Sequence, residues 1–200
     1  MTPPSHPRQR LLDAAMEVVG ADGLRGLTHR RIEQQAGMAR GSARYHLGAR
    51  DDIIAALLEY SAVTEFAMIE RRLARVGADF LVGTTVSLPS VAAALVAALL
   101  EDPPRVRARY ELLLEASRRP SLRAEARRWR DYFVQAAEQA LASAGVADPG
   151  NAAVLLVATL DGVTLDAVLS DRKEAPELAR LAASALLNGG PSGAGLRAGM

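Results

Sequence analysis

The sequence has no cysteine in 200 residues and only three histidines, all of them within the first fifty positions. Disulfide bonds, thiolate metal sites and cysteine nucleophiles are therefore excluded. An enzyme would have to rely on carboxylates in the rest of the chain, and Glu111 with Glu115, four residues apart, is the best pair available. Such a pair without a histidine, a phosphate loop or a metal-ligand cluster is usually a helix surface. We therefore predict no catalytic residue, no metal and no cofactor.

Aromatic residues make up only 4% of the chain, which is dominated by helix-favouring alanine, leucine, arginine and glutamate. This composition disfavours β-sheet and predicts an all-α protein. No uncharged apolar run reaches the roughly eighteen residues of a membrane span. No apolar stretch follows residues 1–7 as it would in a secretory signal. We expect a cytoplasmic protein with no membrane partner.

Acidic and basic residues are unevenly distributed, although the net charge is only +1. Up to Arg50 there are eight arginines against Asp13, Glu17, Asp22 and Glu33, which gives a net charge of +4. The remainder has sixteen bases and nineteen acids, a net charge of −3. This split indicates a small polyanion-binding module attached to a near-neutral body, although a few surface arginines placed by chance would give the same numbers.

The basic end begins with two short helices. Apolar residues at helical spacing place the first helix at 8–21, and Gly23 follows its end. Thr28 is suited to cap a second helix over 29–36. Gly37 ends that helix, because glycine is the residue best able to take the positive φ of a tight turn.

A third helix is expected to begin near Ala39 or Arg40. Proline, glycine and charged interruptions divide the rest of the chain into six further helices, about nine in all. These six are predicted over 50–76, 88–100, 104–117, 122–144, 152–169 and 176–187.

The charges at two helix starts oppose the helix macrodipole, which favours acids in a first turn. The second helix opens with His29, Arg30 and Arg31, and the third with Arg40. A phosphate resolves the conflict, because it accepts the free N–H groups of a helix start and pairs with the flanking cations. The alternative is a solvated charged face.

The third helix carries side chains that a DNA major groove can use. Arg44 can bond guanine through two hydrogen bonds, Ser42 can donate or accept, and Gly41 permits close backbone approach. Tyr45 and His46 fit backbone phosphates better than base edges. Alternatively, this tyrosine and histidine form a partly buried packing pair on a short helix.

From Leu27 to Ile54 the sequence LTHRRIEQQAGMARGSARYHLGARDDII resembles, without a gap, the N-terminal domain of TetR-family repressors. In that family a threonine caps the second helix and contacts phosphate, a basic-Gly-Ser/Thr segment opens the recognition helix, and an aromatic-His-aromatic ending precedes a basic-acidic helix start. The resemblance assigns these roles to Thr28, Arg40-Gly41-Ser42, Tyr45-His46-Leu47 and Arg50-Asp51. The DNA-binding residues expected here are Thr28, His29, Arg30, Arg40, Gly41, Ser42, Arg44, Tyr45, His46 and Arg50.

Four positions depart from the family's usual residues. Ala43 replaces leucine, Leu47 replaces phenylalanine, and Ala49 replaces a capping serine. The smaller Ala43 and Leu47 are expected to cost about one or two kcal/mol each unless neighbours compensate. Arg44 replaces a frequent tyrosine and adds a base-reading donor, so operators deduced from tyrosine-bearing relatives do not transfer to this chain.

We expect four segments. The two ends, 1–7 and 189–200, look like disordered tails. Between them the resemblance implies a helix-turn-helix DNA-binding domain (8–50) and a helical regulatory and dimerisation domain (51–188). Within the latter domain, residues 151–166 look like the first of two helices through which family members form a four-helix bundle with a second copy. This stretch is apolar nearly all round, as expected of a helix covered by its own domain and by a partner. Full burial inside a monomer is the alternative. The expected interface residues are Leu155, Leu156, Thr159, Val163, Ala183, Leu186 and Leu187.

In the family, the helices between these ends enclose a small-molecule pocket whose occupancy moves the DNA-binding heads apart. The residues that suit such a pocket, as apolar walls or polar anchors, are Tyr110, Glu111, Leu114, Trp129, Phe133, Asp161 and Thr164. The alternative for each is ordinary core packing, and Asp161, Thr164 and Asp166 also suit the dimer seam, since buried polar groups need partners.

The sequence therefore predicts a homodimeric repressor that binds a palindromic operator and is released by a small apolar or amphipathic effector. Two recognition helices about 34 Å apart would meet successive major-groove faces. Activation is open as well, since promoter geometry decides it. The rival hypothesis is a helical ligand- or protein-binding module with a non-functional DNA-binding head. DNA binding that falls steeply with salt distinguishes the two.

Overall fold

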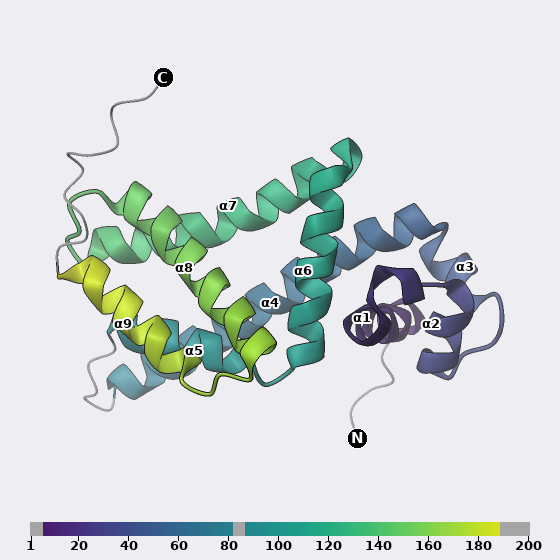
Figure 1. Ribbon diagram of the computed structural model, residues 1–200, viewed down its shortest axis with the longest axis horizontal. Helices are drawn as coiled ribbons and strands as arrows, with labels where there is room; N and C mark the ends of the chain where they lie inside the picture. Colours follow the sequence, from purple (N-terminus) through teal and green to yellow (C-terminus); the bar gives the residue numbers. More distant parts are fainter. Residues whose placement is uncertain (1–5, 82–86, 189–200) are drawn as a thin grey trace. The chain divides into compact units, whose positions relative to one another are not determined.

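The computed structural model describes the backbone of residues 6–81 and 87–188, with the side chains of these ranges outside 72–81. Throughout the described ranges the regular structure is α-helix, in nine helices with no strand (Figure 1). The predicted all-α fold is confirmed. Residues 1–5, 82–86 and 189–200 lie outside the described residues. The expected C-terminal tail (189–200) and most of the expected N-terminal tail (1–7) are therefore not described.

The nine helices follow the predicted order. Their bounds are α1 (Pro7–Gly26), α2 (His29–Ala36), α3 (Ser42–Leu47), α4 (Arg50–Leu81), α5 (Leu88–Leu99), α6 (Pro103–Arg118), α7 (Pro120–Ser143), α8 (Pro149–Ser170) and α9 (Ala175–Leu187).

Several helix bounds differ from the sequence prediction, and the helix predicted to end at residue 76, α4, continues to Leu81. Two of the differences have a local cause at a glycine. The helix α1 does not stop at Gly23 but bends there, at φ 66° and ψ −177°, and makes a short further turn. The helix α3 begins at Ser42 rather than near Ala39, because Gly41 has φ 94° and lies outside the helical region. Glycine takes such angles at no steric cost, so it fixes where each helix changes direction.

The chain divides into two compact units. Unit 1 comprises Met1–Met68 and Asp102–Trp129, and unit 2 comprises Ile69–Glu101 and Arg130–Met200. In unit 1, α1 packs against α2, α3 and α6. Its buried core includes Leu11, Leu12, Leu27, Ile32, Ala43, Leu47, Ile53, Leu57 and Leu112. Ala43 is completely buried despite its small size, so its neighbours close around the position where the family usually has leucine.

The helices α1 and α6 cross at very close range within unit 1. A Cβ atom added to Gly20 would lie 2.3 Å from the carbonyl oxygen of Pro104. Beside this crossing, Arg107 donates through Nε to the carbonyl of Gly20 at 3.0 Å. The carboxylate of Asp13 accepts hydrogen bonds from Tyr60 and Arg105, each at 2.6 Å. Burial and the bond to Asp13 raise the pKa of the Tyr60 hydroxyl.

Unit 2 is built around α5, α8 and α9, which pack against one another. Small residues fill the buried part of this cluster, including Ala92, Ala153, Ala167, Ala175, Ala179 and Ala183, together with Val96, Leu141 and Leu156. Alanines allow close helix approach, and they leave the larger apolar side chains of α8 and α9 for the outer faces.

Candidate nucleic-acid interface

The start of α2 has the predicted cap. Thr28 is extended, with φ −129° and ψ 149°, and its hydroxyl oxygen accepts a hydrogen bond from the backbone N–H of Arg31 at 3.3 Å. Arg31 also pairs through its guanidinium with Asp22 of α1. At this helix start one free N–H group is therefore already satisfied by the protein.

The turn between α2 and α3 has the geometry of a helix-turn-helix. Gly37 has φ 61°, as predicted, and its N–H donates to the carbonyl of Gln34. The N–H of Met38 donates to the carbonyl of Glu33 at 2.9 Å. Gly41, the residue before α3, also takes a positive φ, so two left-handed glycines set the path of the turn.

The sequence analysis missed one residue that contributes to this turn. Glu33 is buried, and its Oε1 atom accepts the backbone N–H groups of Gly41 and Ala43 at 2.9 and 3.1 Å. A carboxylate on an otherwise charged helix gave no signal in the apolar spacing. The sequence did offer a chemical signal. A short helix that begins after glycine has no side-chain cap of its own, so its free N–H groups need an acceptor such as a nearby carboxylate.

The side chains expected to contact DNA are mostly exposed. Arg30, Arg40 and Arg44 are all exposed, and Tyr45 has 84% of its surface accessible. The Tyr45 ring meets the His46 ring edge to face, with centroids 4.8 Å apart. Ser42 and His46 are half-buried. A Cβ added to Gly41 would meet no atom within 4 Å, so the backbone there is open to close approach.

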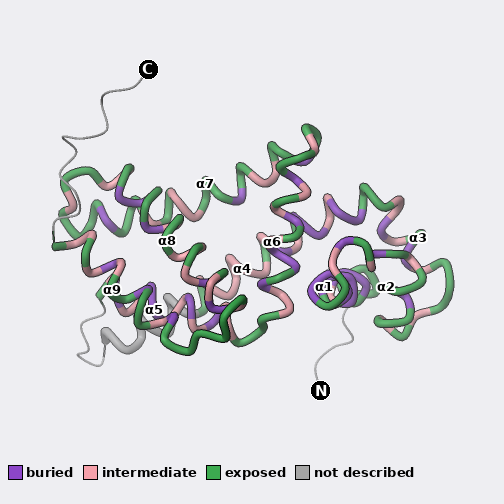
Figure 2. Tube along the Cα trace, viewed as in Figure 1, coloured by how far each residue is buried: buried purple, intermediate pink, exposed green. Residues whose placement is uncertain are grey.

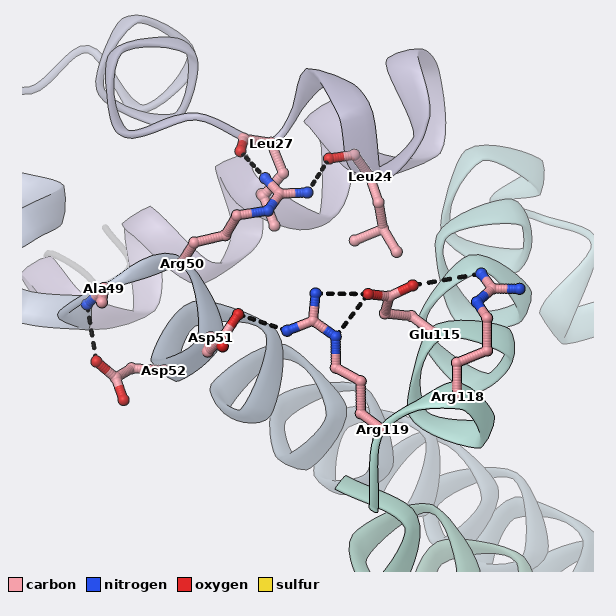
Figure 3. Close-up of polar contacts among 9 residues, drawn as sticks. All are labelled: Leu24, Leu27, Ala49, Arg50, Asp51, Asp52, Glu115, Arg118 and Arg119. Carbon is pink, nitrogen blue, oxygen red and sulfur yellow. Dashed lines mark hydrogen bonds and ion pairs between the residues drawn. The ribbon is translucent and has the colours of Figure 1, made fainter. Parts of the chain in front are cut away.

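Two of the expected DNA-binding residues form hydrogen bonds within unit 1. His29 donates through Nε2 to the carbonyl of Gly48 at 2.7 Å. Arg50 donates through its two terminal nitrogens to the carbonyls of Leu24 and Leu27 (Figure 3). These bonds hold the segments on either side of the recognition helix, and a phosphate contact by either residue stays a prediction.

The start of α4 is held by carboxylates. Asp52 accepts the backbone N–H of Ala49 at 2.8 Å, which supplies half of a capping box where the capping serine is missing. Asp51 pairs with Arg119, which also binds Glu115 (Figure 3). The hydrogen bond from Arg119 is the main cause that lowers the pKa of Glu115.

A charged depression of about 370 Å³ lies beside these contacts in unit 1, and it is lined in part by Gly23, Arg25, Arg50 and Glu111. Glu111, predicted as a polar anchor of a ligand pocket, is exposed there. Among the residues with described side chains, no three His, Asp or Glu side chains gather closely enough to hold a metal ion.

The residues predicted for a ligand pocket are divided between the units. In unit 1, Trp129 is 8% exposed, and the Arg109 guanidinium lies 4.6 Å from its ring centroid and 5.2 Å from that of Tyr110. Arg109 also pairs with Glu65 at 3.7 Å. Leu114, in contrast, is 59% exposed. A buried cation between two aromatic rings is the main feature of this cluster.

In unit 2 the remaining pocket candidates have partners inside the unit. Asp161 pairs with Arg130 at 2.9 Å. Thr164 is buried and donates to the carbonyl of Leu160 at 2.7 Å, so its hydroxyl is satisfied within its own helix. Phe133 is half-buried and meets Tyr132 edge to face. Ligand binding by these residues stays a prediction.

The predicted dimer residues divide by burial. Leu156 and Ala183 are buried in the core of unit 2, whereas Leu155 and Thr159 are exposed and Val163, Leu186 and Leu187 are half-buried. Along α8 an exposed face recurs at intervals of three or four residues, formed by Val154, Ala158, Gly162, Leu165 and Leu169. Figure 2 shows extended exposed stretches on α8 and α9.

By length and composition α8 is apolar enough to cross a membrane, and it is the one such helix among the described residues. A single helix of this kind is weak evidence for a membrane span, since core helices pass the same test. Only 28% of its most apolar window is buried in the single chain.

Comparison with known proteins identifies the fold. Residues 83–189 match the family described as tetracyclin repressor-like, C-terminal domain. The multidrug binding protein EbrR, in a crystal structure with imidazole, is 34% identical, with 94% of this chain and 98% of that chain covered and a TM-score of 0.65.

A TetR-family member from Streptomyces coelicolor, SCO1917, is 31% identical, with 90% of this chain and 98% of that chain covered and a TM-score of 0.71. Among curated proteins, none matches the chain. The family match covers just over half of the chain, and the solved relatives are similar along nearly all of it. The chain therefore belongs to the TetR family of transcriptional regulators.

Proposed function

We propose that this regulator is a repressor that binds a palindromic operator through α2 and α3 as a homodimer and leaves it when a small molecule binds. The observation that carries the proposal is the exposure of three basic side chains, Arg30, Arg40 and Arg44, on a helix-turn-helix whose α2 has a threonine cap. Such a surface attracts phosphates, and α3 adds groups that bond to base edges. We assign the protein to the cytoplasm, where its operator lies, and no catalytic step is part of the proposal.

The exposed residues are assigned distinct roles. Arg44 and Ser42 contact bases, and the open backbone at Gly41 permits the approach. Thr28, Arg30, Arg40, Tyr45 and His46 are assigned to phosphates. His29 and Arg50, which bond to backbone carbonyls, are assigned to hold the helix-turn-helix in shape.

Two variants test the DNA-contact assignment with the DNA that flanks the protein's own gene. Arg44→Ala should flatten the preference between operator and scrambled duplex, because a bidentate base contact discriminates by about 1–3 kcal/mol. Arg40→Ala should weaken binding to both duplexes alike. The reverse pattern would overturn the roles assigned to these two arginines.

We propose that the apolar faces of α8 and α9 pair with a second copy. The supporting observation is the exposed face on α8 that ends with Leu169, at 77% exposure, together with exposed Leu178 and Leu181 on α9. Sedimentation of Leu169→Glu should show loss of the dimer. Leu114→Glu is the matched control, because Leu114 is also an exposed leucine but lies on α6. Dimers of equal stability in both variants would exclude this face.

The proposed effector is a small apolar or amphipathic molecule that carries an aromatic ring system. EbrR has been crystallised in complexes with ethidium and malachite green. In this chain the Trp129 and Tyr110 rings and the nearly buried Glu65 carboxylate hold the guanidinium of Arg109, and the same groups are suited to an aromatic cation that displaces it.

Trp129 is the sole tryptophan of the chain, so its fluorescence reports on this cluster. Titration with ethidium should quench it and should dissociate the protein from operator DNA over the same concentration range. Trp129→Phe supplies the control without signal. An operator complex that persists at saturating ethidium would exclude this dye class as effector.

A further inference from the structure

The recognition helix α3 is short and has no cap of its own. It has six residues, and the residue before it, Gly41, has no side chain with which to accept a backbone N–H. A helix start of this kind leaves N–H groups that need partners from elsewhere in the fold. The N–H groups at the start of α3 therefore depend on acceptors that α2 and the turn provide, while Ala43 and Leu47 pack into the core.

Glu33 of α2 provides those partners. Its side chain is 6% exposed, and the single atom Oε1 accepts the N–H groups of Gly41 and Ala43 at 2.9 and 3.1 Å. Its backbone carbonyl accepts the N–H of Met38 at 2.9 Å. One residue thus holds the middle of the turn, the residue before α3 and the first turn of α3.

Steric packing contributes little at the two glycines of this turn. A Cβ added to Gly37 or to Gly41 would meet no atom within 4 Å. A depression of about 370 Å³ within the helix-turn-helix is lined by Arg30, Glu33, Gln34, Met38 and Arg40. Where packing is open, directional hydrogen bonds determine the geometry, and the bonds to Glu33 fill that role.

We propose that Glu33 is a positioning residue for sequence recognition, because it fixes the start of α3 and with it the placement of Arg44 and Ser42. The inference rests on the proposed DNA binding through α3. Phosphate contacts by Arg30 on α2 do not depend on this cap. Loss of the cap therefore lowers discrimination between DNA sequences more than it lowers affinity for DNA in general.

Two conservative substitutions distinguish the effect of side-chain length at position 33 from the effect of its charge. Glu33→Gln keeps a carbonyl oxygen at the same distance from the backbone and removes the charge. Glu33→Asp keeps the charge but is one methylene shorter, so it cannot reach both N–H groups. Glu59→Gln is the matched control, since Glu59 is an exposed carboxylate on α4.

The measurements are the ratio of operator to scrambled-duplex affinity and amide hydrogen exchange at Gly41 and Ala43. Glu33→Gln should keep the ratio within about threefold of the wild type, whereas Glu33→Asp should lower it about tenfold, the factor expected for loss of a hydrogen bond to a charged group. Exchange at Gly41 and Ala43 should accelerate in Glu33→Asp, while Ile32 in the core remains protected.

The opposite order would overturn the proposal in favour of a role for charge alone. In that case Glu33→Asp would keep the wild-type ratio of operator to scrambled-duplex affinity, and Glu33→Gln would lower it. Unchanged exchange at Gly41 and Ala43 in Glu33→Asp would also overturn the proposal. The exchange measurement needs no DNA, so it decides whether Glu33 positions α3 even if the wild-type protein fails to bind an operator. Failure of the proposed function and failure of this inference are therefore distinguishable.

Discussion

The close crossing of α1 and α6 predicts that Gly20→Ala destabilises unit 1. The new Cβ would lie 2.3 Å from the Pro104 oxygen and 2.7 Å from its carbonyl carbon, and neither is the end of a flexible side chain. The helix α6 would have to move away by about 1 Å to restore ordinary contact. Such a shift also lengthens the bond from Arg107 to the Gly20 carbonyl.

Two effects of opposite sign determine the magnitude. Alanine is favoured over glycine inside a helix by about 1 kcal/mol. Overpacking against rigid backbone costs about 1–3 kcal/mol and occasionally more, and the loosened Arg107 bond adds to this loss. We expect a net destabilisation of about 2 kcal/mol, which lowers the Tm of a protein of this size by roughly 4 to 8 °C.

Thermal unfolding followed by circular dichroism measures the effect. Gly150→Ala is the matched control, because its Cβ would meet the nearest atom, Oε1 of Glu138, at an ordinary 3.5 Å. That variant should unfold at or slightly above the wild-type temperature. If Gly20→Ala also rises to or above the wild-type Tm, α6 does not approach α1 as closely as described, and the packing of unit 1 is wrong.

Three further predictions concern unit 1. Ala49→Ser should raise the free energy of unfolding by about 0.5–1 kcal/mol in chemical denaturation, because it completes the capping box that Asp52 half supplies; a loss of stability would contradict this cap. Ala43→Leu should lower stability by about 1–3 kcal/mol, since the position is fully buried around alanine, and a stabilised variant would show that space remains. The pKa of Glu115 is held below its ordinary 4.5. The contribution of Glu115 to the free energy of unfolding is therefore present above that value and is lost as the pH falls through the lower pKa of the folded state. The Tm of the wild type should therefore exceed that of Glu115→Gln near neutral pH and converge with it on acidification; a constant difference would argue against the Arg119 contact.

The parts of the fold that were predicted from the sequence depend on signals close together in the chain. Thr28 caps α2, and Gly37 ends it in the left-handed conformation, because both roles follow from the chemistry of a single residue. The helix-turn-helix was predicted in this way. The exposed arginines on α2 and α3 were candidates for the same reason, since charge and position were visible in the sequence.

What the sequence did not reveal depends on contacts between distant segments. The crossing of α1 with α6 requires Gly20, yet nothing near Gly20 indicates that Pro104 lies against it. The cap from Glu33 to Gly41 and Ala43 spans the turn, so helical periodicity does not detect it. The inward bonds of Arg50 were missed because an exposed, basic residue near a DNA-binding motif is readily assigned to phosphate.

The proposed dimer face likewise combines a feature that local sequence predicted with one that depends on packing between helices. An apolar helix over 151–166 was recognised from composition, but burial of Leu156 and exposure of Leu165 and Leu169 depend on how α8 is rotated against α9. When a helix is apolar on all sides, its hydrophobic pattern does not indicate which face is buried. The packed structure was needed to decide which side remains open to a partner.

The most direct test of the central claim is an anisotropy titration of labelled DNA from the region flanking the protein's own gene, alongside a scrambled duplex, at several salt concentrations. The account predicts tighter binding to the flanking DNA, with an affinity that falls linearly in log–log form as salt rises, because phosphate contacts release counterions. It also predicts that Arg44→Ala loses the preference for the flanking DNA. Absence of binding at low salt, or equal binding of both duplexes by the wild type and Arg44→Ala, would contradict the assignment of α3 as the element that recognises DNA sequence.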